Sequence, residues 1–372
     1  MNDILVSKST LPPLDEYIEK IRPMWDSHWI TNNGSIQNEF EKEIRNFLLA
    51  QECTLFVNGH LALDLAIKAL GLRGEVITTP FTFASTTHAI SLNGLKPVFC
   101  DISPVDFNID VTKIEALINE KTTAIIPVHV YGNPCNVEAI QEISDKYDLK
   151  VIYDAAHAFG VEVGDIGIGN FGDFSMFSFH AAKVFHSIEG GALIYKDPSW
   201  KEILDSLKNF GIGYDGNYGG LPGLNAKMNE FQAAMGSVNL KYLSKEISAR
   251  REVYCVYKAL LSDISGFYFI PENEKVKHNY SYAPILIDPD ASGVTRDELT
   301  EELRKHGIYA RKYFYPLTSD LACYSKFSNS NSTPVAKKVS DNILALPLYG
   351  ELIENVNGIC EIIYTIINSR IR

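Results

Sequence analysis

Short apolar runs alternate with amphipathic stretches over the first 200 residues of this chain. Each run is three to five residues long, which suits a strand buried on both faces. Continuous apolar strands that alternate with helices are typical of an α/β domain with a mostly parallel sheet. The predicted strands are 54–57, 76–79, 97–100, 124–128, 151–153, 175–178 and 192–195, and the helical patterns between them include 61–70, 83–92, 110–118 and 136–147.

The rest of the chain predicts a second, smaller domain. Residues 228–261 form one long helical pattern that leads into it. Beyond this pattern the chain mixes strands with helices, which is an α+β arrangement. We therefore predict a large domain over 1–240, which begins with a helical segment, and a small C-terminal α+β domain over 241–372.

Composition narrows the class of protein. With 46% hydrophobic and 22% charged residues, the 372-residue chain is typical of a soluble globular protein. No apolar run is long enough to cross a bilayer, and the first residues lack a signal-peptide pattern, so we expect a cytoplasmic protein without a membrane partner. The net charge of −12 argues against a nucleic-acid partner. The six cysteines form no Cys-x-x-Cys pair, so we expect neither disulfides nor a metal site.

Lys183 is a candidate nucleophile. It follows the predicted strand 175–178 and precedes Gly190-Gly191 and the next strand. A partly desolvated lysine at the mouth of a parallel sheet is the amine that a carbonyl substrate or pyridoxal phosphate needs for a Schiff base. Taken alone, Lys183 is better explained as a surface lysine whose stem lies on apolar neighbours.

Asp154 and His157 come at the end of another predicted strand. Ligands of parallel sheets bind beyond the carboxyl ends of the strands. A carboxylate there can pair with a pyridinium nitrogen and keep it protonated. The alternatives are a helix N-cap for Asp154 and a buried core histidine for His157. Because Asp154 precedes Ser178 and Lys183, the two segments together point to one cofactor site.

Two further turns fit the same cofactor. Asn58-Gly59-His60 joins a strand to a helix, and free N–H groups at a helix N-terminus suit a phosphate. The alternative is an ordinary turn capped by Asn58. Phe83 follows another strand and could stack on a planar ring, although it is otherwise a plain core residue.

The long loop near 209–228, rich in Gly and Tyr, is of a kind that is usually functional or intersubunit.

Seven motifs in one order, from about Leu11 to Pro347, resemble the DegT/StrS family of pyridoxal-phosphate-dependent nucleotide-sugar aminotransferases, of fold type I (aspartate-aminotransferase-like). One such motif would be weak evidence, but seven in order are hard to obtain by chance. The motifs are Asn58-Gly-His60, Phe81-Thr-Phe83-Ala-Ser, Val128-His-Val-Tyr-Gly132, Asp154-Ala-Ala-His157-Ala-Phe-Gly160, Ser178-Phe-His-Ala-Ala-Lys183, Glu189-Gly-Gly191 and Gly223-Leu-Asn225-Ala-Lys227-Met.

The resemblance implies roles for the residues around the cofactor ring. Lys183 forms the Schiff base and later moves a proton. Asp154 pairs with the pyridine nitrogen, His157 lies near the ring oxygen O3′, and Phe83 stacks on the ring.

The resemblance also implies a phosphate site that two subunits share. Gly59, His60 and Ser178 hold the cofactor phosphate. Asn225 reaches the phosphate of the neighbouring subunit's cofactor, and Lys227 is a second candidate there, so a homodimer is expected. For the sugar–nucleotide cleft our candidates are Thr31, Lys227, Tyr313 and Tyr315, each of which could instead be a packing residue.

The chain departs from the family pattern at a few positions. His60 stands where Thr is common, so the phosphate contact there falls to the backbone N–H. His157 replaces the commoner Gln, and Ala226-Lys227 stands where Tyr-Arg is frequent. A branch with His in place of the lysine removes a hydroxyl group instead of transferring an amine, and Lys183 argues against that chemistry.

The N-terminal segments look most like the VioA-type branch, which transfers an amine from glutamate to C4 of dTDP-4-keto-6-deoxyglucose. The product is an amino sugar for surface polysaccharides such as O-antigen. One alternative keeps the chemistry but changes the substrate to a C3-keto sugar, or to a GDP- or UDP-linked sugar. Another is a sugar-binding sensor without cofactor or activity.

Overall fold

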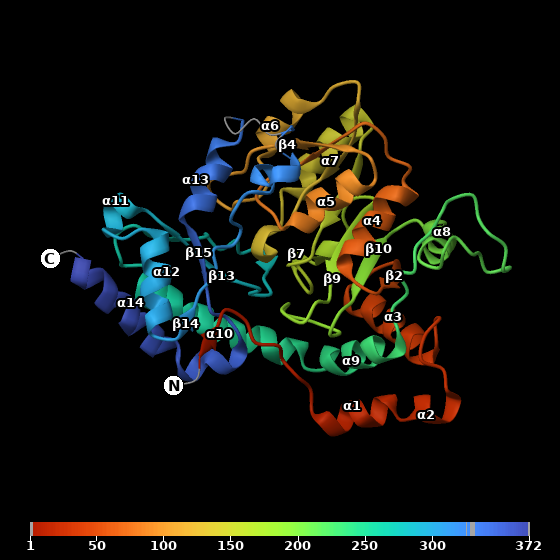
Figure 1. Ribbon diagram of the computed structural model, residues 1–372, viewed down its shortest axis with the longest axis horizontal. Helices are drawn as coiled ribbons and strands as arrows, with labels where there is room; N and C mark the ends of the chain where they lie inside the picture. The colour runs from red at the N-terminus through yellow and green to blue at the C-terminus, as the bar shows by residue number, and fades with distance from the viewer. Residues whose placement is uncertain (1–2, 325, 328–331, 371–372) are drawn as a thin grey trace.

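The protein is described from a computed structural model, in which residues 3–324, 326–327 and 332–370 are placed. Figure 1 shows a larger part around one sheet, and a smaller part that holds β13, β15, α12 and α14. Helix α10 runs beneath both parts. In the described chain no helix is both long and apolar enough to span a bilayer.

Seven strands form the central sheet in the order β2-β10-β9-β6-β5-β3-β4. Strand β10 runs antiparallel to both of its neighbours, and the other adjacent pairs are parallel. The predicted mixed, mostly parallel sheet is confirmed. The strands are β2 (Glu52–Phe56), β3 (Glu75–Thr78), β4 (Lys96–Phe99), β5 (Thr122–Ile126), β6 (Lys150–Asp154), β9 (Phe174–Ser178) and β10 (Gly191–Tyr195).

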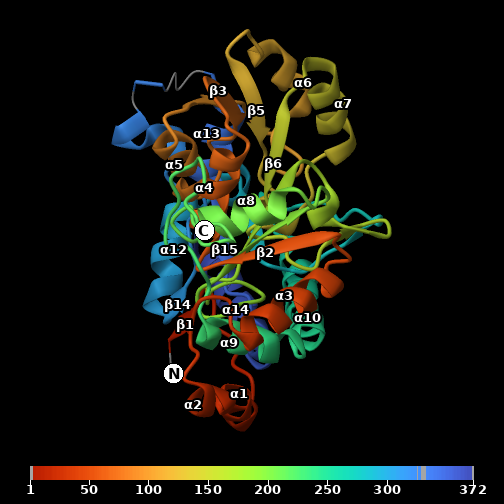
Figure 2. The same ribbon diagram turned by 90° about the vertical axis from the view of Figure 1, so that its right-hand side faces the viewer.

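Helices cover both faces of this sheet, which is why its strands are apolar throughout. Successive residues of a strand point to opposite faces: Ile77 and Ile125 lie in one core, whereas Val76 and Ala124 lie in the other. Figure 2 shows α3 and α9 on one side of β2, with α4 and α8 on the other. The first core is covered by α3 (Ser35–Phe47), α7 (Val137–Tyr147) and α9 (Glu230–Leu240), and the second by α4 (Gly59–Ala69), α5 (Ala84–Leu92) and α8 (Trp200–Leu207).

The smaller part has its own core around an antiparallel sheet in the order β11-β13-β15. Strand β1 (Ile4–Leu5) pairs in parallel with β14 (Ile308–Tyr309), so the N-terminal residues join this part. Its other elements are α10 (Leu243–Leu261), β11 (Phe267–Phe269), β13 (Ala283–Ile287), α11 (Pro289–Ser292), α12 (Arg296–Lys305), α13 (Pro334–Asn342), β15 (Ile343–Leu346) and α14 (Val356–Arg370).

The prediction of one helix over 228–261 is wrong, because the chain bends between α9 and α10. The N–H groups of Lys241 and Tyr242 bond to carbonyls three residues back instead of four. At the bend the Asn239 side chain donates to the carbonyl of His186, in the loop after β9.

The remaining elements are α1 (Leu14–Ile21), α2 (Pro23–Ser27), α6 (Val111–Ile114), the small sheet β12-β7-β8 (Val276–Lys277, Glu162–Val163, Ile166–Gly167) and short 3-10 helices at Glu115–Leu117, Val130–Gly132, Ile168–Asn170, Thr318–Asp320, Ala322–Tyr324 and Gly350–Glu354.

Candidate active site

Several of the predicted cofactor residues lie at the carboxyl edge of the sheet. Strand β6 ends at Asp154, and its parallel neighbour β9 ends at Ser178. Strand β2 leads at the same edge into Asn58 and the start of α4. Parallel strands bring their ends to one edge, so segments more than 100 residues apart become neighbours.

Asp154 is a buried carboxylate held on two sides. The Thr86 hydroxyl donates to its Oδ2 at 2.7 Å, and the Ala156 N–H donates to its Oδ1 at 3.1 Å. Burial raises the pKa of Asp154, while these hydrogen bonds and the positive charge of Lys183 act in the opposite direction. A buried carboxylate of this kind is stabilised by a cation placed beside it.

His157 is buried in its neutral form. Burial lowers its pKa well below the ordinary value, and the charges of Lys183 and Arg311 add to this effect. The Tyr131 N–H donates to its Nδ1 at 3.3 Å, which leaves the proton on Nε2. Nε2 lies 3.4 Å from the hydroxyl of Tyr313, and the imidazole ring stacks on Phe314 with centroids 5.6 Å apart.

Lys183 lies in the loop between β9 and β10, and its side chain is partly buried. Its N–H donates to the carbonyl of His180 at 2.9 Å, which makes a turn directly before the side chain. The charge of Lys183 acts on the pKa values of both Asp154 and His157. The amine, the acid and the histidine therefore form one electrostatic group.

The N-terminus of α4 forms a narrow cradle beside β9. The Asn58 side chain accepts from the Leu61 N–H at 2.8 Å, so Asn58 is the N-cap, as one alternative predicted. A Cβ on Gly59 would lie 2.9 Å from Cβ of Ser178, so only glycine fits there without a shift. His60 turns toward α5, with Nδ1 2.8 Å from Oγ of Ser85. The cap uses the Leu61 N–H and leaves the N–H groups of Gly59 and His60 available for an anion.

Phe83 is exposed, in contrast to the residues before it. Its exposed fraction is 53%, whereas Phe81 is fully buried in the core. Phe83 stands immediately before α5, the helix that supplies Thr86 to Asp154. An exposed aromatic ring at this position is available to stack on a planar ligand.

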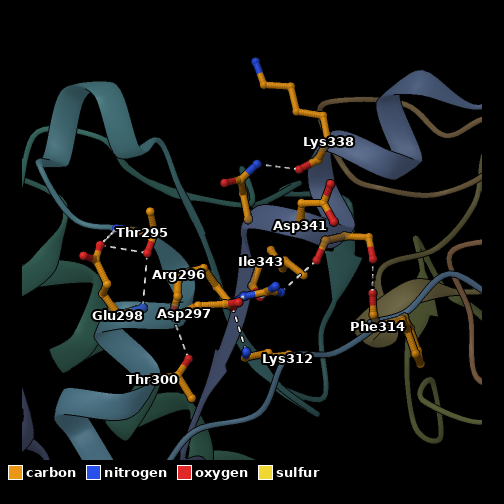
Figure 3. A network of polar contacts seen from close by, with 12 residues as sticks. Thr295, Arg296, Asp297, Glu298, Thr300, Lys312, Phe314, Lys338, Asp341 and Ile343 are labelled. Carbon is orange, nitrogen blue, oxygen red and sulfur yellow. Dashed lines mark hydrogen bonds and ion pairs between the residues drawn. The ribbon is translucent and has the colours of Figure 1, made fainter.

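Two of the cleft candidates lie two residues apart but in different surroundings. Tyr313 is buried against His157, and its carbonyl accepts a short hydrogen bond from the Tyr131 hydroxyl. Tyr315 is 46% exposed, and the guanidinium of Arg296 lies 4.6 Å from its ring centroid. Figure 3 shows how this segment is held: Lys312 pairs with Asp297, and the carbonyl of Phe314 accepts a hydrogen bond from a neighbouring hydroxyl. This hydroxyl belongs to Ser340, and the bond is 2.7 Å long.

The remaining candidates lie on exposed or half-exposed segments. Thr31 is exposed, just before α3. Asn225 is exposed in a strand-like bridge with Asn209, and the amine of Lys227 lies 2.6 Å from the Asn209 side-chain oxygen. In the described chain neither Asn225 nor Lys227 hydrogen-bonds to Asp154, His157 or Lys183. The loop after α8, which leads to these residues, projects from the body of the molecule (Figure 1).

Two residues near the site have no signal in the sequence. Thr86 binds Asp154 from a helix 68 positions earlier. The guanidinium of Arg311 lies 4.4 Å from the ring centroid of Tyr313 and acts on the pKa of His157. Arg311 forms no ion pair with any described carboxylate, although its neighbour Lys312 pairs with Asp297 at 2.8 Å. A periodicity argument cannot find such contacts, because they depend on where separate loops meet.

Pyridoxal phosphate fits these donors. Its ring nitrogen suits the buried Asp154 carboxylate, its aldehyde suits the Lys183 amine, and its ring suits the exposed face of Phe83. Its phosphate suits the cradle at Gly59 and Ser178. By contrast, the described residues contain no group of three or more His, Cys, Asp or Glu side chains that could hold a metal ion.

Comparison with known proteins points to one family. The sequence pattern of the DegT/DnrJ/EryC1/StrS aminotransferase family matches residues 14–364. The chain is 43% identical over 354 residues to a dTDP-4-amino-4,6-dideoxy-D-glucose transaminase of Shigella dysenteriae, which covers 95% of this chain and 96% of that protein. It is 44% identical over 365 residues to an Escherichia coli protein of the same name, which covers 96% and 97%.

Solved structures show the same fold. A crystal structure of DesI in the presence of its TDP-sugar product superimposes with a TM-score of 0.94 and 30% identity. The match covers 99% of this chain and 93% of that chain.

Proposed function

The chain belongs to the DegT/DnrJ/EryC1/StrS aminotransferase family, and from this premise we propose that it is a pyridoxal-phosphate-dependent transaminase that moves an amino group from glutamate to C4 of dTDP-4-keto-6-deoxyglucose. The observation that carries the chemistry is the group formed by Lys183, Asp154 and His157 beside the α4 cradle. The choice of sugar rests on 43% and 44% identity to two transaminases named for dTDP-4-amino-4,6-dideoxyglucose.

Each residue of this group has one task. Pyridoxal phosphate, when bound, supplies an aldehyde that condenses with amines and a ring that accepts electrons. Lys183 would hold the aldehyde, and its amine would take and return the proton at the reacting carbon. Asp154 keeps the ring nitrogen protonated, because its buried carboxylate needs a positive partner.

The neighbouring side chains orient the ring. His157 is neutral and carries its proton on Nε2, so it donates a hydrogen bond to the ring oxygen without adding charge. Phe83 supports one ring face. The N–H groups of Gly59 and His60 and the hydroxyl of Ser178 hold the phosphate at the positive end of α4. Together these residues would orient the ring for the reaction.

Arg311 gives the site a cation for an acidic substrate. Its guanidinium is fixed over the Tyr313 ring and has no ion-pair partner among the described residues. Glutamate carries carboxylates that pair well with a guanidinium. We assign Arg311 to the carboxylate of the amino donor.

The site is completed by a second copy of the chain. Asn225 and Lys227 follow a projecting loop with exposed aromatic side chains, including Phe210, Tyr214 and Tyr218. Such a loop is suited to reach a partner's cofactor. Mixing Lys183→Ala with Asn225→Asp tests this: if sites are shared, a mixed dimer has one intact site, and activity returns. If both residues act within one chain, the mixture stays inactive.

Borohydride reduction tests the proposed cofactor chemistry. We expect purified protein loaded with pyridoxal phosphate to be yellow, and reduction to leave a pyridoxyl group on the peptide that contains Lys183. Lys183→Ala should lose this label. Protein that takes up no cofactor would instead support a sugar-binding sensor.

A panel of keto sugars tests the proposed substrate. The protein is incubated with glutamate and dTDP-, GDP- or UDP-linked sugars, and products are identified by mass spectrometry and NMR. We expect amination at C4 of the dTDP sugar. Amination of a 3-keto sugar alone, or of a GDP- or UDP-linked sugar alone, would overturn the substrate assignment but keep the chemistry.

A further inference from the structure

Gln232 joins the two loops that carry opposite ends of the candidate site. Its side-chain nitrogen Nε2 donates to the backbone carbonyl of Val57 at 3.1 Å and to that of Glu189 at 2.7 Å. Val57 directly precedes Asn58 and the first turn of α4. Glu189 closes the loop that contains Lys183. One amide group therefore connects the phosphate side of the site to the amine side.

The start of α9 fixes the orientation of this amide. The N–H of Gln232 donates to Oδ1 of Asn229, and the Asn229 N–H donates back to Oε1 of Gln232, which is a capping box. Nε2 then faces two carbonyl oxygens, which can only accept. Gln232 is 7% exposed, so water competes little for these bonds.

The two loops also touch directly. A Cβ on Gly191 would lie 2.6 Å from both the carbonyl carbon of Asn58 and the nitrogen of Gly59. The Val57 N–H is bonded to the carbonyl of Ala226, just after Asn225. Closely packed segments transmit a displacement from one to the next. A change at Gln232 would therefore shift the Lys183 loop relative to the cradle.

On the basis of the function proposed above, we propose that Gln232 is a positioning residue that sets the distance between the α4 cradle and Lys183. The Gln232 amide donates to backbone carbonyls of both loops, so Gln232 would act through these loops. The phosphate and the aldehyde of pyridoxal phosphate have a fixed separation, so both bind at once only if the two half-sites are correctly spaced. A ligand that occupies one half-site alone does not depend on this spacing.

Three probes separate spacing from general damage. Inorganic phosphate reports on the cradle, pyridoxal reports on Lys183 and the ring site, and pyridoxal phosphate needs both. Their affinities are measured by fluorescence titration of the full chain after removal of the cofactor, together with its melting temperature. The variants are Gln232→Met, which removes both donated bonds, and Gln232→Glu, which keeps the shape but sets a carboxylate against two carbonyls.

We expect both variants to bind pyridoxal phosphate roughly tenfold or more weakly. Their affinities for phosphate and for pyridoxal should change less than about threefold. Gln37→Met is the matched control, since Gln37 is also a buried glutamine, and its hydrogen bonds go to Glu41 and Glu230 and to neither loop. It should leave the affinities for all three ligands unchanged.

Two results would overturn the role of Gln232. An unchanged affinity for pyridoxal phosphate would show that the spacing does not depend on Gln232. An equal loss of affinity for all three ligands, together with a lower melting temperature, would show that Gln232 only stabilises the fold. If the wild-type chain bound pyridoxal phosphate no better than phosphate, the proposed function itself would fail.

Discussion

The hydroxyl of Thr86 donates to Oδ2 of Asp154 at 2.7 Å, and both side chains are buried. Thr86 lies 2.9 Å from the hydroxyl of Thr82, which can donate to it in turn. The Ala156 N–H binds the other carboxylate oxygen. The acid that we assign to the ring nitrogen is thus fixed in rotation from two separate elements.

Replacing Thr86 with valine should impair catalysis without unfolding the protein. The hydrogen bond to a charged group is worth about 1.5–3 kcal/mol, so kcat should fall by roughly 10–100-fold. Because this bond lowers the pKa of Asp154, its loss raises that pKa. The acid side of the pH–rate profile should therefore move to higher pH, as measured by steady-state kinetics.

Thr87→Val is the matched control for this change. Thr87 is the next residue of α5 and is also buried. Its hydroxyl donates to that of Thr318 at 3.0 Å, and not to Asp154. It should leave the pH–rate profile in place. Equal effects of the two variants would show that Thr86 acts through the packing of α5 alone.

Replacing Arg311 with methionine should weaken the binding of the amino donor in particular. Loss of a charge-assisted carboxylate contact predicts a roughly 10–100-fold higher half-saturating glutamate concentration in the first half-reaction. The half-reaction with the keto sugar should change less than about threefold, as followed by the cofactor absorbance in single turnovers.

Lys312→Met provides the comparison, because Lys312 adjoins Arg311 but is paired with Asp297 at 2.8 Å. This variant should leave both half-reactions near their wild-type rates. If Arg311→Met slowed only the sugar half-reaction, the guanidinium would serve the diphosphate of the nucleotide instead.

Gly236→Ala should destabilise the protein although alanine favours helices. Gly236 lies in α9, and a Cβ there would lie 2.3 Å from the nearest ring carbon of the fully buried Phe40. Overpacking of this kind costs about 1–3 kcal/mol. Gly358→Ala in α14 meets nothing within 4 Å and should stabilise by about 0.5–1 kcal/mol. Thermal melting at one protein concentration measures both, and equal shifts would contradict the packing around Phe40.

Acid should destabilise the fold through buried neutral histidines. Burial lowers the pKa of His129 to about 3, against about 6.5 in an unfolded chain. Below about pH 6.5, His129 therefore binds a proton in the unfolded state but stays neutral in the folded state. This contribution to stability is complete above about pH 6.5 and is lost progressively as the pH falls toward 3.

His129→Phe should flatten this pH dependence, as seen by thermal melting between pH 7.5 and 4.5. At neutral pH it should also destabilise by about 1–3 kcal/mol, because the Cys135 N–H loses its acceptor Nδ1. The exposed His306 offers a control, and His306→Phe should leave the slope unchanged. An unaltered slope for His129→Phe would contradict the burial of a neutral ring.

The sequence predicts the large domain well because its signals are local. Seven apolar runs match seven strands of one sheet, since strands buried on both faces must be apolar throughout. The rule that ligands bind at carboxyl ends then leads to Asp154 and Ser178. The break between α9 and α10 was missed, because Asn239 binds a loop that is distant in sequence.

The sequence by itself determined the fold class and led to the residues that we propose for the chemistry, because periodicity and motif order depend on neighbouring positions. The tertiary structure alone decided which groups hold these residues in place. It puts Thr86 on Asp154 and Gln232 between two loops, and it buries Tyr313 against His157 while Tyr315 stays half-exposed. These contacts join positions far apart in the chain, so they exist only once the sheet has brought its strand ends together.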